Sequence, residues 1–191
     1  ETGGLLLIEN SRINSLYHYD CFHRFTVYME KQFRFVANLP EHIHQKLTLR
    51  LHAQYFKMCS FEDMRWKDRS PNTKIELGTV KIKEMIKQSR LVVHSYDSTG
   101  ILETLAMDIP TICFWGGGLN HLLPSAKPYY ELLADVGILF YSPESAAKFI
   151  SLHWDDISGW WESKKVQDAR KIFCDQYART VADPVQKLKD I

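Results

Sequence analysis

The chain has 191 residues, of which 45% are hydrophobic, 13% aromatic and 25% charged, a composition typical of one globular domain and unlike that of a disordered, collagen-like or coiled-coil chain. Its 24 Lys and Arg residues almost balance 23 Asp and Glu residues, and the formal charge of +1 excludes the strong positive field of a nucleic-acid-binding protein. The longest apolar stretch, Leu102 to Trp115, is interrupted by Glu103, Asp108 and Pro110. We therefore expect no nucleic-acid partner and no transmembrane segment.

Cysteine and histidine spacings argue against bound metal and against a disulfide scaffold. The four cysteines, Cys21, Cys59, Cys113 and Cys174, form no C-x-x-C pair, which favours reduced thiols in a cytoplasmic protein. No signal peptide is visible at the start of the chain. The closest histidine pairs lack a local third ligand, so no metal and no cofactor are predicted. These pairs are His18 with His23 and His42 with His44.

Short apolar runs alternate with helical patterns along the first three quarters of the chain. The predicted strands are Leu5–Ile8, Leu47–Leu51, Lys74–Leu77, Arg90–Val93, Thr111–Trp115 and Ile138–Tyr141. The predicted helices are Tyr19–Leu39, Thr79–Ser89, Thr99–Met107, Pro128–Val136, Pro143–Trp154 and Val166–Thr180. Several strands are continuously apolar, which is typical of a parallel sheet covered on both faces. The sequence therefore predicts an α/β fold, a Rossmann-like open parallel sheet flanked by helices with a helical carboxyl-terminal tail.

The same pattern suggests a division of the chain into three parts. Residues 1–3 resemble a vector remnant, residues 4–153 form the predicted Rossmann-like domain, and residues 154–191 form a helical tail that packs on it. Because the domain begins directly on a core strand, we expect it to be part of a longer protein. Trp154, Trp160 and Trp161 are predicted to pack the tail against the sheet, with a sugar-stacking platform as the alternative.

A polar turn between a buried strand and a helix is the main candidate for chemistry. Ligands of open α/β sheets bind at the carboxyl ends of strands, and the first turn of a helix offers unpaired N–H groups and a positive dipole end to an anion. Glu103 lies one helical turn further on, where its carboxylate could accept hydrogen bonds from a ribose diol. The residues of this candidate anion site are Ser95, Asp97, Ser98, Thr99 and Gly100.

A purely structural interpretation of this turn remains open. Asp97 or Ser98 could act only as an N-cap contributing about 1 kcal/mol, with Gly100 required for packing and Glu103 solvated. The turn matches neither a P-loop nor a dinucleotide-binding glycine fingerprint.

Two further segments carry weaker signals. Arg50, near the end of a predicted strand, could clamp a phosphate or form an internal salt bridge. The glycines Gly116–Gly118 could form a flexible loop or a phosphate cradle. No nucleophile motif is present, so the sequence identifies no catalytic residue.

The segment His94–Trp115 resembles the carboxyl-terminal half of a GT-B glycosyltransferase and, more narrowly, a family of bacterial transferases linked to surface-polysaccharide synthesis. The resemblance covers nearly the whole chain after residue 4. Its other segments are Glu30–Phe35, Arg65–Arg69, Ser125–Tyr130, Ser142–Ser145, Gly159–Trp161 and Cys174–Thr180.

This resemblance implies a donor-binding domain for a nucleotide-activated sugar. The Ser95–Gly100 turn would hold the diphosphate, Glu103 the ribose, and Arg50 would offset charge on the leaving group. The remaining partners would be a glycan acceptor and a missing amino-terminal domain of the same protein, without which the fragment would be inactive. Peripheral association with the inner membrane face is left open for this cytoplasmic protein. At Gly116–Gly118 the sequence departs from the narrow family, in which this turn is bulkier and polar.

Other functions remain compatible with this scaffold. One is a non-catalytic module that binds a glycan or a protein, since fold alone does not determine function. The others are a sugar-nucleotide epimerase and a polyol-phosphate transferase.

Overall fold

The computed structural model describes residues 3–10, 25–55, 61–181, 183 and 185. Its centre is a six-stranded parallel sheet with the strand order β3-β2-β1-β4-β5-β6. Each predicted strand is present, with small shifts at the ends, and the predicted fold class is confirmed. The strands are β1 (Leu5–Ile8), β2 (Leu47–Arg50), β3 (Lys74–Glu76), β4 (Leu91–His94), β5 (Thr111–Phe114) and β6 (Leu139–Phe140).

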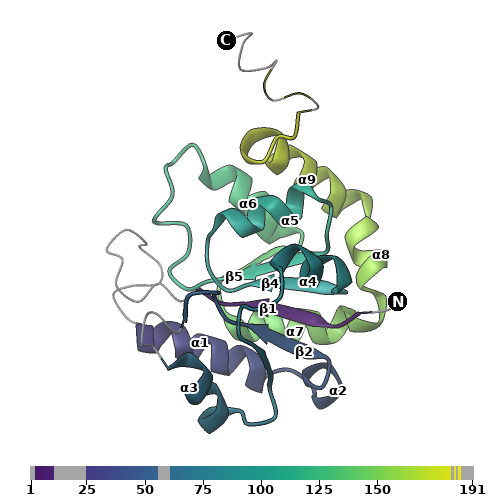
Figure 1. Cartoon of the computed structure of the whole chain (residues 1–191). Coiled ribbons are helices and arrows are strands. Elements are labelled where there is room, and N and C mark those ends of the chain that lie inside the picture. The colour runs from purple at the N-terminus through teal and green to yellow at the C-terminus, as the bar shows by residue number, and fades with distance from the viewer. Residues whose placement is uncertain (1–2, 11–24, 56–60, 182, 184, 186–191) are drawn as a thin grey trace.

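Helices cover both faces of this sheet (Figure 1). The first face is covered by α1, α2, α3 and α7, and the second by α4, α5, α6 and α9. The helices are α1 (Phe25–Ala37), α2 (Glu41–His44), α3 (Glu62–Arg69), α4 (Ile82–Gln88), α5 (Thr99–Ala106), α6 (Lys127–Asp135), α7 (Pro143–His153), the 3-10 turn η2 (Trp154–Asp156), α8 (Ile157–Glu162) and α9 (Lys164–Tyr177).

One helix prediction is corrected by the structure, one lies partly outside the described residues, and two helices were missed. The part of the first predicted helix before α1, residues 19–24, lies outside the described residues. Helix α4 begins only at Ile82, and Val80, predicted for its apolar side, precedes the helix and is exposed. Helices α2 and α3 were not predicted, because α2 has only 4 residues and α3 is strongly polar around a single buried tryptophan, Trp66.

Side-chain alternation along the strands assigns each position to one face. In β1, Leu5 and Leu7 belong to the core under α1 and α7, whereas Leu6 and Ile8 pack with Ile86 of α4. Both sets are almost fully buried. Each such side chain contributes roughly 2 kcal/mol of hydrophobic stabilisation, which explains why these strands are continuously apolar.

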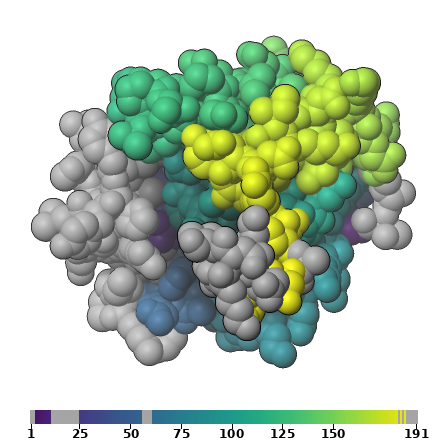
Figure 2. Space-filling model, turned by 90° about the horizontal axis from the view of Figure 1, so that it is seen from above, coloured from purple at the N-terminus to yellow at the C-terminus, as the bar shows by residue number. Residues whose placement is uncertain are grey.

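Helix α9 packs on α5 and α6, and α8 packs on α9. In the space-filling view, the yellow atoms of this carboxyl-terminal part lie over teal and green atoms of the preceding chain (Figure 2). Trp154 and Trp161 are only 2% and 4% exposed, and the Trp160 indole Nε1 donates to the carbonyl oxygen of Val136 at 3.0 Å. Because these indoles are engaged in packing, they do not form an exposed sugar-stacking platform. The division of the chain at residue 153 stays a prediction.

The strand order creates a crevice at the carboxyl ends of β1 and β4. The chain moves outward from β1 through β2 to β3, then returns to place β4 on the other side of β1. Connections that leave these two central strands therefore diverge, which is the usual position of a ligand in an open α/β sheet. Among the described residues, no helix is long and apolar enough to cross a membrane, and no group of three or more metal-ligating side chains occurs.

Candidate functional site

A pocket of about 310 Å³ opens at this crevice. Its lining combines apolar side chains, among them Ile8 of β1 and two isoleucines of α4, with polar and charged ones. Four of the predicted site residues line it, one from the end of β2 and three from α5. These residues are Arg50, Thr99, Gly100 and Glu103.

The amino-terminal end of α5 faces this pocket without a side-chain cap. Ser98 occupies the N-cap position in an extended conformation, but its hydroxyl makes no capping hydrogen bond. The Ser98 Oγ atom is buried and has no partner within the described part of the chain. The backbone N–H groups of Thr99 and Gly100, which start the helix, likewise have no recorded acceptor among described residues. The capping interpretation of Ser98 is therefore wrong, and this helix end presents unpaired donors.

His94, which sequence reasoning did not single out, lies beneath this helix end. Its side chain is 1% exposed and its Nε2 atom lies 3.2 Å from Thr104 Oγ1. Because the Thr104 hydroxyl can donate to the carbonyl oxygens of Gly100 and Ile101, at 3.1 and 3.2 Å, we assign the proton of the imidazole to Nε2. Burial lowers the pKa of His94 to about 3, so the ring is neutral.

The other imidazole nitrogen of His94 lies against the glycine that begins α5. Its Nδ1 atom is buried and has no hydrogen-bond partner among the described residues. A Cβ atom on Gly100 would lie 2.9 Å from His94 Cε1 and 3.4 Å from Ser98 Oγ. Gly100 is thus needed for the close approach of ring and helix. The alternation in β4 could have revealed His94, because its position alternates with Val93 and faces the same side as Val92.

Arg50 forms the internal salt bridge that was left open as an alternative. Its guanidinium lies 3.5 Å from the Glu76 carboxylate and donates to the carbonyl oxygens of Leu51 and Val80, at 3.3 and 3.2 Å. Arg50 also lines the pocket, so one side chain braces the β2 and β3 loops while facing the cavity. Much of its charge is already compensated by Glu76.

Ser95 and Asp97 brace the turn and do not line the pocket. The Ser95 hydroxyl donates to the carbonyl oxygen of Ile8 at 3.2 Å and lies 2.9 Å from the Tyr28 hydroxyl. Asp97 accepts a hydrogen bond from the Tyr130 hydroxyl at 3.2 Å, and its second oxygen lies 3.0 Å from His121 Nε2. Burial, with a further contribution from Asp97, raises the pKa of Tyr130, so this phenol stays protonated and donates. A direct ligand contact by Ser95 or Asp97 stays a prediction.

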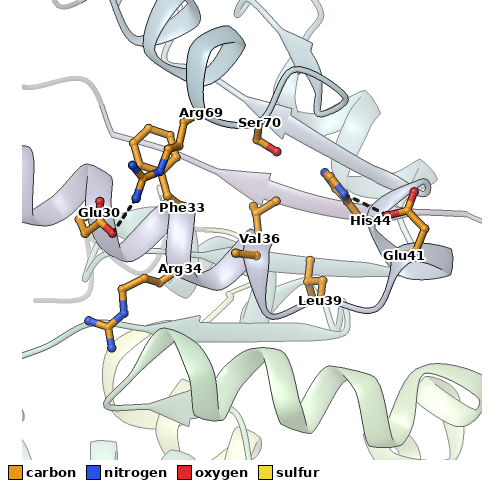
Figure 3. Close-up of a pocket in the computed structure, with 10 residues that line it drawn as sticks. Glu30, Phe33, Arg34, Val36, Leu39, Glu41, His44, Arg69 and Ser70 are labelled. Atoms are coloured by element: carbon orange, nitrogen blue, oxygen red, sulfur yellow. Dashed lines mark hydrogen bonds and ion pairs between the residues drawn. The ribbon is translucent and has the colours of Figure 1, made fainter.

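A second pocket of about 230 Å³ lies between α1, α2 and α3 (Figure 3). Its ionisable side chains are paired: Arg69 lies 3.3 Å from Glu30, and His44 lies 4.0 Å from Glu41. Arg34 extends away from Arg69 and pairs with Glu144. This pocket therefore offers fewer unpaired polar groups than the crevice at β1 and β4, which we take as the candidate site.

A model of the LIC12162 family of transferases matches residues 1–191. The chain belongs to the LIC12162 transferase family. The predicted resemblance to a transferase family is thereby confirmed. Among solved structures, one titled as the crystal structure analysis of the glycotransferase of kitacinnamycin is similar, with a TM-score of 0.44 and 14% sequence identity. That match covers 93% of this chain and 39% of the solved chain. No curated protein matches the sequence.

Proposed function

We propose that this LIC12162 family chain is the donor-binding domain of a GT-B glycosyltransferase and that its crevice pocket binds a nucleotide-activated sugar. The observation that carries this proposal is the uncapped amino-terminal end of α5, where Thr99 and Gly100 line a pocket of about 310 Å³ and their N–H groups have no recorded acceptor among the described residues. The buried Ser98 hydroxyl beside them does not line the pocket and also lacks a partner among those residues. A helix end of this kind attracts phosphate through its hydrogen-bond donors and its dipole.

The residues around the pocket suit the parts of such a ligand. Ser98, Thr99 and Gly100 would hold the diphosphate, and the exposed carboxylate of Glu103 would accept hydrogen bonds from the ribose hydroxyls. Transfer from an activated donor develops negative charge on the departing diphosphate, which fixed donors at a helix end stabilise without reorganising. Arg50 would contribute N–H donors more than net charge, because Glu76 already neutralises it.

The complete reaction would require more than this domain. By the resemblance to GT-B enzymes, an amino-terminal domain of the same protein would supply the acceptor site and the general base, and this domain alone would be inactive. The glycan acceptor would belong to surface-polysaccharide synthesis in the cytoplasm. We assign no catalytic residue within this chain.

A ligand panel on the full-length protein tests donor binding. Thermal unfolding would be followed with UDP, CDP, GDP, CMP and their sugar conjugates, and hits would be measured by isothermal titration. A ligand at 100 times its dissociation constant stabilises the folded state by about 2.7 kcal/mol, a readily measured shift. Absence of any shift at millimolar concentrations would overturn the proposal.

Glu103→Ala gives the first test by mutation. We expect about tenfold weaker nucleotide binding from loss of a charge-assisted hydrogen bond, with unfolding temperature unchanged because Glu103 is exposed. Glu131→Ala, at an exposed position of α6, is the matched control and should leave both quantities unchanged. A strongly destabilised Glu103→Ala variant would show that Glu103 is structural.

A further inference from the structure

Lys31 of α1 lies against Gly116, the first glycine of the turn that follows β5. A Cβ atom on Gly116 would collide with the Lys31 ammonium group and would lie 2.9 Å from its Cε atom. The absence of a side chain at position 116 therefore allows this lysine to reach the turn. Phe35, one helical turn after Lys31, stacks on Phe114 of β5 with 4.9 Å between the ring centroids. This contact holds that part of α1 against the strand.

The Lys31 ammonium has no compensating anion among the described residues. Lys31 is half-buried, as is Lys127, whereas the other described lysines are exposed. It forms no recorded hydrogen bond or ion pair, in contrast to the buried guanidinium groups of Arg50 and Arg170, which pair with Glu76 and Asp108. Its three N–H donors are therefore open to an oxyanion from outside the described residues.

The glycine turn beside Lys31 is held in place by its neighbours. Trp115 Nε1 donates to the carbonyl oxygen of Gly118 at 3.1 Å, and His121 further along is bonded to Asp97. Gly117 and Gly118 have positive φ angles of 107° and 65°, which glycine adopts without strain. Within the described part of the chain, the backbone N–H groups of Gly116–Gly118 donate no recorded hydrogen bond. The turn therefore presents a cation together with unpaired N–H groups.

We infer that Lys31 and the Gly116–Gly118 turn form a second anion-binding site, which takes a phosphate or carboxylate group. Its position follows from the register of the sheet, in which His94 of β4 pairs with Cys113 of β5. The turn after β5 thus starts beside the turn that leads to α5, one strand away from the crevice pocket. Asp97 is the carboxylate of the β4 turn, and the Tyr130 hydroxyl and His121 already contact it.

This site adds a second binding element to the proposed function. Anion binding by the site does not depend on that function, but the identity of the molecule that carries the anion does. A nucleotide-sugar held at α5 would place its transferred group toward neighbouring strand ends, where Lys31 could bind an acidic substituent. The same geometry suits a phosphate on the acceptor. Both ligands present oxyanions, and the site recognises that shared chemistry through one ammonium and a row of backbone donors.

Pyrophosphate binding to the full-length protein, followed by isothermal titration, tests the site without any nucleotide. Lys31→Met removes the charge while keeping the length of the side chain, and Gly116→Ala displaces the ammonium while keeping the charge. We expect each variant, made in a Gly100→Ala background that blocks the α5 site, to weaken pyrophosphate binding about tenfold. Lys171→Met, at an exposed position of α9, removes the same charge elsewhere and should have no effect.

The outcomes separate this inference from donor binding at α5. Unchanged pyrophosphate affinity in both Lys31→Met and Gly116→Ala overturns the site, and an equal loss in Lys171→Met overturns it as a general charge effect. Lys31-dependent pyrophosphate binding without nucleotide binding supports the site and removes the proposed donor pocket.

A second set of titrations identifies the source of the anion. The first titrations compare a nucleotide-sugar that carries a carboxylate with a neutral one. If Lys31→Met weakens binding of the carboxylate sugar more than that of the neutral sugar, the anion belongs to the donor. A selective loss for glycerol phosphate assigns it to the acceptor. If neither probe responds to Lys31→Met, the assignment of the site to substrate binding is overturned, and only the pyrophosphate titrations still support an anion site.

Discussion

The two ends of helix α5 differ in whether their polar groups have hydrogen-bond partners. At its carboxyl-terminal end, the Arg170 guanidinium donates to the carbonyl oxygen of Leu105 at 2.8 Å and lies 3.1 Å from the Asp108 carboxylate, which also accepts from Trp161 Nε1 at 3.0 Å. At its amino-terminal end, Ser98 Oγ and His94 Nδ1 are buried without partners in the described chain. One end is closed by the carboxyl-terminal helices, and the other is open to a pocket.

Within a helix of 8 residues, this difference separates polar groups that are paired inside the protein from polar groups without recorded partners in the described chain. Buried polar groups are normally hydrogen-bonded, so a cluster of exceptions needs a specific explanation. Asp108 even adopts a positive φ of 57°, an uncommon conformation that its three contacts stabilise. We expect changes at the closed end to alter stability, and changes at the open end to alter binding.

Arg170→Met should produce the largest effect. The carbonyl oxygen of Leu105 would lose a buried, charge-assisted hydrogen bond. Asp108 is half exposed, so water would partly replace its lost ion pair. We therefore expect the free energy of unfolding to fall by about 3 kcal/mol. Urea denaturation measures this loss, with Lys171→Met on the exposed side of α9 as the control. Nucleotide affinity of the folded variant should be unchanged. A substantial change in nucleotide affinity would contradict the expectation that the carboxyl-terminal end of α5 affects only stability.

His94 makes the open end sensitive to acid. Since burial lowers the pKa of His94 to about 3 from 6.5, the unfolded chain binds a proton between these values that the folded protein does not. Stability therefore rises with pH in this window and falls on acidification, by about 1.4 kcal/mol per pH unit from this group. Glu9 has the opposite effect on stability. Burial and the nearby Glu62 raise its pKa, so above its unfolded pKa the folded protein binds a proton that the unfolded chain does not, and stability from this group falls as the pH rises.

His94→Gln isolates this contribution, because the amide can still donate to Thr104 but does not titrate. The free energy of unfolding would be measured by urea denaturation at pH of about 5.5 and 4.5. On going from the higher to the lower pH, the wild type should lose about 1.4 kcal/mol more of this free energy than the variant. Equal pH dependence in the two proteins would contradict a neutral, buried His94 in the folded state.

The sequence predicted the sheet well because its information is local and repeated. Each strand is a run of apolar residues bounded by polar turns, and the Ser95–Gly100 turn follows such a run directly. Arg50 illustrates the opposite case, since its partner Glu76 lies on another strand and only the parallel register of β2 and β3 brings the two together.

The parts of the site that sequence reasoning missed depend on packing across the fold. The meeting of Lys31 with Gly116 requires α1 to lie over β5, far along the chain. The polar helix α3 has no apolar stripe, and its one core residue, Trp66, donates its indole N–H to the buried carboxylate of Glu9. Neither contact leaves a periodic signal in the sequence.

Gly100→Ala tests the open end by closing it sterically. The new methyl group would lie against His94 and Ser98, where we propose that a phosphate contacts the start of α5. We expect affinity for a nucleoside diphosphate to fall by about tenfold or more. We expect a moderate loss of stability, because the crowding against the buried His94 ring outweighs the gain of at most about 1 kcal/mol from replacing a helical glycine. Ala106→Gly, at the other end of α5, should lose about 1 kcal/mol and keep its affinity.

Ser98→Ala should have the smallest effect on stability and the most diagnostic one. An N-cap serine replaced by alanine ordinarily costs about 1 kcal/mol, and Ser142→Ala at the start of α7 should show that loss because Ser142 Oγ accepts from the Ser145 N–H at 3.1 Å. Ser98 makes no such bond, so its removal should change stability by less than about 0.5 kcal/mol while weakening nucleotide binding about fivefold. Chemical denaturation and titration of both variants compare the same residue at the same helix position. If Ser98→Ala is as destabilising as Ser142→Ala and binding is unchanged, then Ser98 belongs to the fold and the open end of α5 is not a ligand site.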